Sequence, residues 1–537
     1  MAVGGETIEA VERDLLAGHV TDLEGSVFAL VGLPEAVKGA LFARYSRSPK
    51  GLRRLLLDEF AEELGRAGPV GGTEVGAEAE GGRAAGLYEK VFVQYGDDSV
   101  AQLGGAHVAV EQASNLLTKV LEWGRLAAYL EQSTRYIAYD DRPGGRWRYH
   151  RPADVMATPH GAAFEREMDA VFAAYAGLFA PLDAWARERF PQDATASDGV
   201  YRATLRGKVC DVLRGLLPAA TTSNVGIFAS GQSYEQLLLR LRGHPLAEAR
   251  VTGDRLLAAL RQVIPSFVTR VDRPDRGGVW TEYLAGTRDA TRRLATELLA
   301  GIAPQPADEV TLVAYDPDAE TDLLVGMLYP HADLPERQLR RAVEAMGAED
   351  RLAVVRAYTG DRTNRRHRPG RALERVRYRF DVCSDYGAFR DLQRHRMLTI
   401  EWQDLSPRHG YHTPIEIMEA GVDDVWHDTL ARHAALYDRL RPDLPVQAQY
   451  AVGFAYRLRY SMELNARAAM QMIELRTQPQ GHAAYRRVCQ RMHTLIAEQA
   501  GHHAVAEMMR FVDHTAADLG RLEAERAAEA RRARAAP

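Results

Sequence analysis

The sequence is poor in several residue types on which common protein chemistries depend. It has three cysteines, Cys210, Cys383 and Cys489, whose wide spacing is unlike that of zinc or redox motifs and suits a reducing compartment. None of its five lysines lies beyond Lys208, which excludes a Schiff-base lysine from the second half. No run approaches eighteen apolar residues, and the acidic N-terminus lacks the apolar core of a signal peptide. We therefore expect a cytoplasmic protein with no membrane partner.

The charge balance also excludes some classes of function. The formal net charge is -5 and the pI is about 6.4, so no overall basic field favours nucleic acid as a partner. A Walker phosphate loop is absent as well. Any anion must therefore be bound by local arginines. With 537 residues, 46% of them hydrophobic, the chain is long enough for two or three domains.

An internal repeat runs through the chain. FALVGLPEAVKGALFARYSRSP in the first half matches VTLVAYDPDAETDLLVGMLYP in the second, and AVEQASNLLTKVLEWGR matches FDVCSDYGAFRDLQRHR. Further on, LRLRGHPLAEARVTGDRLLAAL matches LRTQPQGHAAYRRVCQRMHTLI. Because the matches occur in the same order, we predict a tandem duplication.

We call the two halves copy one, residues 25–272, and copy two, residues 309–515. A linker over residues 273–308 is expected to contain a helix near 281–301, and residues 68–82 are a Gly-rich insertion in copy one. The tail, residues 516–537, is expected to be helical or disordered. Long stretches have helical periodicity while strands are few and short, so the predicted fold class is α+β, dominated by helices.

Two groups of polar residues suggest anion binding. Copy two has Arg394-His395-Arg396 at a predicted helix end, a dense set of donors suited to a phosphate or an electron-rich ring. Copy one has Ser133 and Arg135 two residues apart in a loop, and a hydroxyl beside a planar guanidinium suits a nucleotide phosphate. Taken singly, Arg-His-Arg is more often a solvated helix end than a ligand site, and a helix N-cap with a surface charge also explains Ser133 and Arg135.

Together these fragments resemble the flavin-dependent thymidylate synthases. The resemblance rests on Arg-His-Arg, on Glu-x-Ser-x-Arg in YLEQSTRY, on Arg-x-x-x-Pro in RGLLP, and on Asn-Ala-Arg and Leu-Arg in NARAAMQMIELR, with Glu374 twenty residues before Arg394. It covers most of both halves, although neither copy has the whole set. It implies reductive methylation of dUMP to dTMP with methylenetetrahydrofolate and NADPH as co-substrates and FAD as cofactor, and it requires no cysteine nucleophile.

The resemblance also implies roles for individual residues. Arg476 and Ser133 would be catalytic. The residues expected to bind the substrate are Glu131, Ser133, Arg135, Arg214, Arg394 and Arg476. The residues expected to bind the flavin are Arg394, His395, Arg396, Asn465, Arg467 and Gln471.

The two copies depart from the family pattern in different places. Copy one has Trp123-Gly124-Arg125 in place of Arg-His-Arg, and Ala229-Ser230-Gly231 in place of Asn-Ala-Arg. In copy two, Ser406 and Arg408 follow the Arg-His-Arg triplet two residues later than Ser133 and Arg135 follow Arg125 in copy one. Copy two also has Gln449 where the second arginine is expected. We therefore expect a composite site, with the nucleotide loop from copy one and the flavin platform from copy two. The family's homotetramer would correspond to a homodimer of tandem chains.

Three alternatives stay open at this point. The protein is a thymidylate synthase, a paralogue that methylates or hydroxymethylates C5 of another pyrimidine nucleotide, or an inactive fusion that binds nucleotide or flavin. A metal site is a weaker interpretation. His503 and Glu507 are one helical turn apart, but an amphipathic helix explains this spacing, and we expect no metal.

Overall fold

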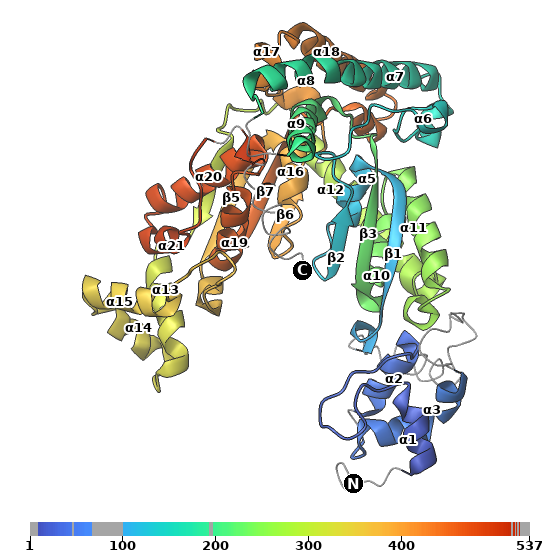
Figure 1. The fold of residues 1–537 in the computed structure, drawn as a ribbon, viewed down its shortest axis with the longest axis vertical. Helices are drawn as coiled ribbons and strands as arrows, with labels where there is room; N and C mark the ends of the chain where they lie inside the picture. Colours follow the sequence, from blue (N-terminus) through green and yellow to red (C-terminus); the bar gives the residue numbers. More distant parts are fainter. Residues whose placement is uncertain are drawn as a thin grey trace. The chain divides into compact units, whose positions relative to one another are not determined.

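The computed structural model describes residues 9–45, 48–66, 100–192 and 197–516, with Leu519, Gly520, Leu522 and Arg526. Within these residues helices dominate and strands form two small sheets, which confirms the predicted α+β class (Figure 1). The predicted insertion at 68–82 and most of the predicted tail lie outside the described residues.

The chain divides into two compact units that differ from the two copies. Unit 1 comprises residues 1–113, 124–131 and 224–302, and unit 2 comprises residues 114–123, 132–223 and 303–537. The middle of copy one therefore folds with copy two. This interleaving places loops from both halves of the chain inside unit 2.

Unit 1 contains a three-stranded sheet in the order β1-β3-β2, formed by β1 (Gly105–Ser114), β2 (Ala127–Glu131) and β3 (Thr222–Ser230). Residues in β3 alternate between buried and exposed, as expected for a sheet with one packed face. The other elements are α1 (Ala10–Ala17), α2 (Glu35–Tyr45), α3 (Leu52–Arg66), α10 (Gly231–Arg242), α11 (Ala247–Leu260) and α12 (Val279–Leu298). The helix expected near 281–301 is α12.

Unit 2 contains a four-stranded sheet in the order β4-β5-β7-β6. Its strands are β4 (Val310–Tyr315), β5 (Arg377–Asp385), β6 (Leu398–Trp402) and β7 (Arg457–Asn465), and the helices against it include α16 (Tyr386–Leu392), α19 (Ala466–Arg476) and α20 (Ala483–Glu498) (Figure 1). The remaining helices are α5 (Asn115–Leu121), α6 (Ala153–Met156), α7 (Gly161–Gly177), α8 (Phe179–Arg189), α9 (Asp198–Leu213), α13 (Ala319–Leu328), α14 (Glu336–Glu344), α15 (Ala348–Thr359), α17 (Ile415–Glu419), α18 (Asp423–Leu440) and α21 (His503–Met508). All pairings within this sheet are antiparallel.

The order of elements repeats between the copies. β1, β3 and β2 occupy the same relative order as β5, β7 and β6. Short helices follow β1 and β5, and their N-cap residues, Ser114 and Asp385, each accept a hydrogen bond from the backbone three residues on. Ser230 and Asn465 likewise cap the helices after β3 and β7. The repeated caps begin the helices at corresponding residues.

Backbone pairing inside unit 2 joins the two copies. Pro218 and Gly453 form an isolated antiparallel bridge. On either side of it, Ala219 N donates to Val452 O at 2.8 Å, and Phe454 N donates to Leu217 O at 2.9 Å. The two segments therefore contact each other through reciprocal hydrogen bonds. Arg214, which opens the short helix Arg214–Leu216, lies just before this pairing.

A buried ion pair fixes helix α19. The two guanidinium Nη atoms of Arg362 each donate to one carboxylate oxygen of Glu474 at 2.7 Å, and the side chains are 1% and 2% exposed. Arg362 Nη1 also donates to Met508 O at 2.6 Å. Because Glu474 precedes Arg476 by two residues, this pair positions the end of α19.

Replacing Glu474 by Gln should lower the free energy of unfolding by about 3–5 kcal/mol, because it leaves the buried Arg362 charge without its partner. Urea denaturation measures this loss. The control is Glu463→Gln, whose carboxylate lies 3.4 Å from Arg379 in a half-exposed pair and whose loss should cost about 1 kcal/mol or less. Equal losses in both variants would contradict the assigned role of the buried pair.

Candidate functional site

Arginines from both copies meet at the carboxylate of Asp391 in helix α16. From copy one, Arg214 Nη1 donates to Asp391 Oδ2 at 3.2 Å. From copy two, Arg476 Nη2 donates to the Asp391 backbone oxygen at 2.5 Å, and its Nη1 lies 3.5 Å from Oδ1. A Cβ at Gly387 would lie 3.1 Å from Arg214 Nη2, so glycine there leaves room for the guanidinium. The structure thus brings these two predicted residues together.

The charges around Asp391 keep it ionised. Burial alone would raise the pKa of this carboxyl, but the positive charges of Arg476, Arg214, Arg394 and Arg135 outweigh burial and hold the pKa far below its ordinary value. Asp391 is therefore a permanent counter-ion for the cluster.

Arg135 is held by a second carboxylate. Its Nε and Nη2 donate to the two oxygens of Asp211 at 2.7 and 2.8 Å, a bidentate pair. Nη1 donates to the hydroxyl of Tyr485 at 2.8 Å, and Nη2 also donates to Gln480 O at 3.0 Å. Burial opposes the charged form, yet the charge and hydrogen bonds of Asp211 raise the pKa of Arg135. The guanidinium is fixed before any ligand arrives.

Tyr485 connects Arg135 with Arg476. Its ring is buried, and the guanidinium carbons of the two arginines lie 5.7 and 5.3 Å from the ring centroid. Both distances are within the range of a cation–π interaction. One aromatic side chain therefore contacts a nucleotide-loop arginine of copy one and the Leu-Arg arginine of copy two.

The histidine of the Arg-His-Arg triplet is neutral. Burial, followed by the positive charge of Arg476, lowers the pKa of His395 to about 3. This agrees with the geometry, since His395 Nε2 accepts a hydrogen bond from Arg476 Nε at 3.0 Å. The flanking Arg394 and Arg396 are exposed. The triplet therefore presents two solvent-facing cations beside an uncharged ring.

The remaining predicted cofactor residues are the N-cap of helix α19 and two residues on that helix. Asn465 caps this helix through its amide oxygen, which accepts from Ala468 N at 2.8 Å. Arg467 donates to Glu374 at 3.1 Å and to Pro369 O at 3.2 Å, and Gln471 is exposed. No hydrogen bond or ion pair within the described residues joins this group to Asp391.

Ser133 and Glu131 differ in their placement. Ser133 Oγ accepts a hydrogen bond from Arg135 N at 3.3 Å, so it shapes the turn that carries this arginine. Glu131 is buried at the end of β2 in unit 1, where it pairs in register with Val225. Arg135, Arg214, Arg394, His395 and Arg476 are the predicted residues that surround Asp391.

Some residues of each copy correspond by the repeat to site residues of the other copy, and they have different surroundings. Trp123, which corresponds to Arg394, donates through Nε1 to Ile400 O at 3.3 Å and packs edge-to-face on Trp402 at 5.7 Å. Gln449, which corresponds to Arg214, accepts from Leu405 N at 2.9 Å. A Cβ at Gly124, which corresponds to His395, would lie 2.6 Å from the hydroxyl of Tyr129.

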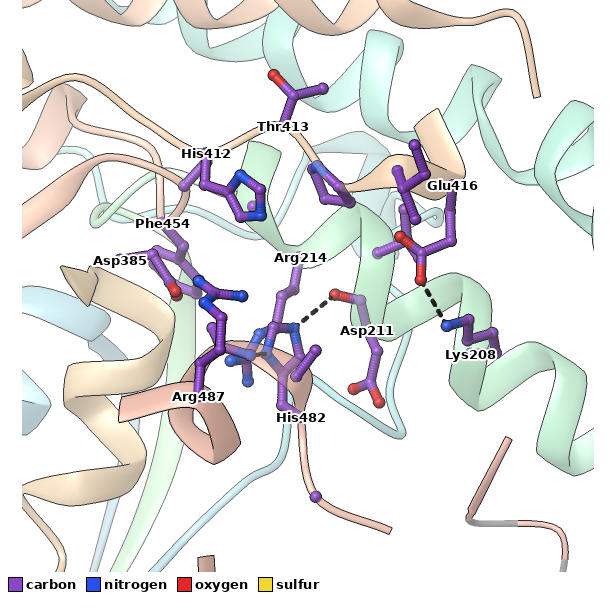
Figure 2. A pocket seen from close by; sticks show the side chains of 18 of the residues that line it. Lys208, Asp211, Arg214, Asp385, His412, Thr413, Glu416, Phe454, His482 and Arg487 are labelled. Carbon is purple, nitrogen blue, oxygen red and sulfur yellow. Dashed lines mark hydrogen bonds and ion pairs between the residues drawn. The ribbon is translucent and has the colours of Figure 1, made fainter. Parts of the chain in front are cut away.

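A cavity of about 430 Å³ adjoins the arginine cluster, and Figure 2 shows Asp211, Arg214 and His482 among its lining side chains. Burial, followed by the charge of Arg214, lowers the pKa of His482 to about 3. Ala484 N donates to His482 Nδ1 at 3.2 Å, so Nε2 carries the proton and donates to Asp211 O at 3.1 Å. Further lining residues include Lys208, Asp385, His412, Glu416 and Arg487.

The described residues contain neither a metal-binding cluster nor a membrane-spanning helix. No group of three or more His, Cys, Asp or Glu side chains there is arranged to hold a metal ion. None of the helices described is long and apolar enough to cross a membrane.

Sequence reasoning missed the carboxylates and the aromatic ring that hold the arginines. Asp211 and Asp391 each precede a predicted arginine by three residues, Arg214 and Arg394. This equal spacing is the pattern in the sequence that could have indicated the two carboxylates. Tyr485 follows the Gly-His of the repeat by three residues and gave no polar signal of its own.

Comparisons with known proteins agree with the motifs. The family model described as thymidylate synthase complementing protein matches residues 44–266 and 311–502. A Chlamydia pneumoniae protein named UPF0159 is 38% identical over 523 residues, 97% of this chain and 98% of that protein. A Thermoplasma acidophilum UPF0159 protein is 28% identical over 515 residues, 91% of this chain and 97% of that protein.

Two solved structures are also similar. A Helicobacter pylori flavin-dependent thymidylate synthase, crystallised with FAD and dUMP, has 16% identity and a TM-score of 0.28, and the match covers 38% of this chain and 100% of that one. A UMP/dUMP methylase from Streptomyces cacaoi, bound with 5-Br dUMP, has 15% identity and a TM-score of 0.28, covering 36% and 93%.

The neutral histidines predict a loss of stability in acid. The folded pKa of His482 is about 3 against an ordinary 6.5, so the unfolded chain binds more protons as the pH falls below 6.5. The free energy of unfolding should then decrease by up to about 1.4 kcal/mol per pH unit for this residue. His482→Gln should make the decline shallower between pH 6.5 and about 4.5, as measured by urea denaturation at each pH. An unchanged slope would contradict a buried neutral His482.

Proposed function

Because the chain belongs to the thymidylate synthase complementing protein family, we propose that it converts dUMP to dTMP at a composite site in unit 2, with FAD as cofactor. The observation that carries this proposal is the meeting of Arg214 from copy one and Arg476 from copy two at Asp391. Each copy alone provides only part of the donor set.

Arg135, Arg214 and Ser133 would bind the nucleotide phosphate. Two guanidiniums and a hydroxyl supply charge-assisted donors, and a doubly charged phosphate competes with the carboxylates of Asp211 and Asp391 for them. Because these carboxylates already hold the arginines in place, phosphate binding needs little reordering of side chains.

Arg476 would act on the pyrimidine ring. Its guanidinium is held by the Asp391 backbone oxygen and by neutral His395, so its position is fixed from two sides. A fixed cation can stabilise negative charge that develops on the ring during transfer of the carbon unit. His395 Nε2 accepts a hydrogen bond from Arg476 Nε and so orients this guanidinium.

The residues at the end of α16 and the start of α19 fit a flavin. Exposed Arg394 and Arg396 match a ligand with a pyrophosphate and an electron-rich ring, and the Asn465 cap leaves its amide nitrogen available as a donor. Bound FAD would supply the hydride, with NADPH as its reductant and methylenetetrahydrofolate as the carbon donor. Arg394, His395, Arg396, Asn465, Arg467 and Gln471 are the residues proposed to hold it.

The cysteines support this chemistry over a thiolate mechanism. All three are buried. Burial raises the pKa of Cys383 and raises that of Cys489 to about 12, so neither is a thiolate near neutral pH.

The nucleotide assignment predicts specific losses of affinity. Arg135→Ala and Arg214→Ala should each weaken dUMP binding by about 1.5–3 kcal/mol, because each removes charge-assisted donors, while the flavin content stays unchanged. Isothermal titration measures the binding. The control is Arg206→Ala, on the exposed face of α9, which should bind dUMP like the wild type.

Two results separate the open alternatives. Formation of dTMP from dUMP, or rescue of a thymidine auxotroph, supports thymidylate synthesis. Turnover of a different pyrimidine nucleotide, without turnover of dUMP, would support the alternative in which that nucleotide is the substrate. Unchanged dUMP affinity in both arginine variants would contradict the proposed composite site.

The asymmetry between the copies predicts one flavin per chain. FAD titration of the apo-protein, followed by absorbance, should saturate at one equivalent, with light scattering giving a dimer of tandem chains. Arg396→Ala combined with Asn465→Ala should lose the flavin, and the matched Arg125→Ala should keep it. Two equivalents per chain would show that Trp123-Gly124-Arg125 is also competent, and loss of flavin in Arg125→Ala alone would reverse the assigned roles.

A further inference from the structure

Helix α12, in the segment that links the two copies, exposes a stripe of uncharged and mostly apolar side chains. This α12 stripe consists of Trp280, Leu284, Thr287, Thr291, Leu294 and Leu298. All of them except Leu284 are exposed, and the exposed fractions of Leu294 and Leu298 are 54% and 71%. Large apolar side chains gathered on one exposed face mark a surface that another element covers. The stripe therefore indicates a partner.

The face of α12 that packs within unit 1 is a different one. The first half of the helix lies against the end of α10, where Arg288 donates to Gly243 O and a Cβ at Gly243 would lie 3.7 Å from Leu284 Cβ. From Thr291 to the end of the helix, every residue is exposed. The stripe therefore continues past the part of the helix that α10 supports.

The spacing of the α12 stripe is that of a coiled-coil seam. Its six positions follow one another in alternate steps of four and three residues. This is the a/d pattern by which two helices insert side chains into each other's gaps. The charged residues Glu282, Asp289 and Arg293 fall on other faces of the helix. The pattern therefore predicts packing against one further helix.

The stripe is complementary to itself when two copies run antiparallel. With the two Asp289 residues at the same level, the layers are Trp280 with Leu298, Leu284 with Leu294, and Thr287 with Thr291. Bulky side chains then pack at both ends and threonines pack at the centre. One surface thus serves both chains across a two-fold axis, as in most homodimers.

Charge also favours the antiparallel direction. In this alignment Glu297 of one helix lies at the level of Thr281, in the first turn of the other helix. The positive end of the helix dipole stabilises a carboxylate there. A parallel pair would align the two dipoles and set Glu297 beside its own counterpart. Because the stripe contains no charged residue, the pairing also buries no ion without a partner.

We propose that α12 pairs with the α12 of a second copy of this chain, antiparallel, across a two-fold axis near Asp289. A helix of this length is about 30 Å long and about 10 Å wide, so the two facing strips amount to about 600 Å². Stable complexes bury roughly 1,200–2,000 Å², so this association is weak and depends on protein concentration. It does not rest on the proposed reaction, because α12 contains none of the residues assigned to nucleotide or flavin.

The first test measures the mass of the full chain by sedimentation velocity over a range of concentrations. Leu294→Glu combined with Leu298→Glu should raise the dissociation constant of self-association at least tenfold. The matched control is Thr296→Glu combined with Ala300→Glu, which adds the same charge on the opposite, exposed side and should leave the constant unchanged. Both side chains of the test pair are largely exposed, so the unfolding temperature should stay that of the wild type.

The second test detects the direction of pairing by disulfide cross-linking. The three native cysteines are buried, so introduced thiols on α12 are the accessible ones. Equal amounts of Thr287→Cys and Thr291→Cys proteins, mixed with oxidised glutathione, should form a linked dimer, and each protein alone should form much less. More cross-linking in either protein alone than in the mixture would overturn the antiparallel pairing.

Two results from sedimentation would overturn the proposal as a whole. One is a wild type that stays monomeric at every concentration, which would assign the stripe to unit 2 of the same chain or to a different protein. The other is an equal dissociation constant in the wild type and the Leu294→Glu, Leu298→Glu variant, which would place self-association on another surface. Neither readout involves turnover, so failure here is distinguishable from failure of the proposed reaction.

Discussion

One buried carboxylate, that of Asp391, makes a shared site of two halves of the chain. Buried guanidiniums repel each other and lose their hydration, so Arg214 and Arg476 are compatible with the same interior only because a carboxylate lies between them. The backbone pairing around Pro218 and Gly453 joins the segment that follows Arg214 to copy two. Arg135 depends on the same arrangement through Tyr485.

The two copies retain the same succession of strands and caps but differ in their side chains. Where copy two has the exposed Arg394, copy one has an indole that packs on Trp402, which itself contacts Phe389 at 5.4 Å. At Gly124, the hydroxyl of Tyr129 fills the space that a larger side chain would need. At the two corresponding positions, copy two therefore has an exposed charged side chain and copy one has a packed aromatic side chain.

The family and the fold class could be predicted from the sequence, but parts of the site could not. Family membership and the helix-dominated class followed from Arg-His-Arg, Asn-Ala-Arg and the repeat, and both are confirmed. The acidic partners did not follow, because Asp211 and Asp391 look like solvated charges in a chain so rich in arginine. The cavity could not be predicted either, since lining residues such as Lys208 and His412 are far apart in sequence and neither belongs to a motif. Asn465 shows a further limit, because its role as a helix cap overlaps the role that its motif suggests.

The interleaving of the halves has a consequence for synthesis on the ribosome. Residues 132–223 leave the ribosome well before residues 303–537, with which they form one compact unit. At ordinary rates of translation this delay lasts on the order of tens of seconds. During that time α7 lacks α18, which later packs against it, and Arg214 lacks Asp391. Residues 132–223 can therefore complete their core only after copy two has been synthesised.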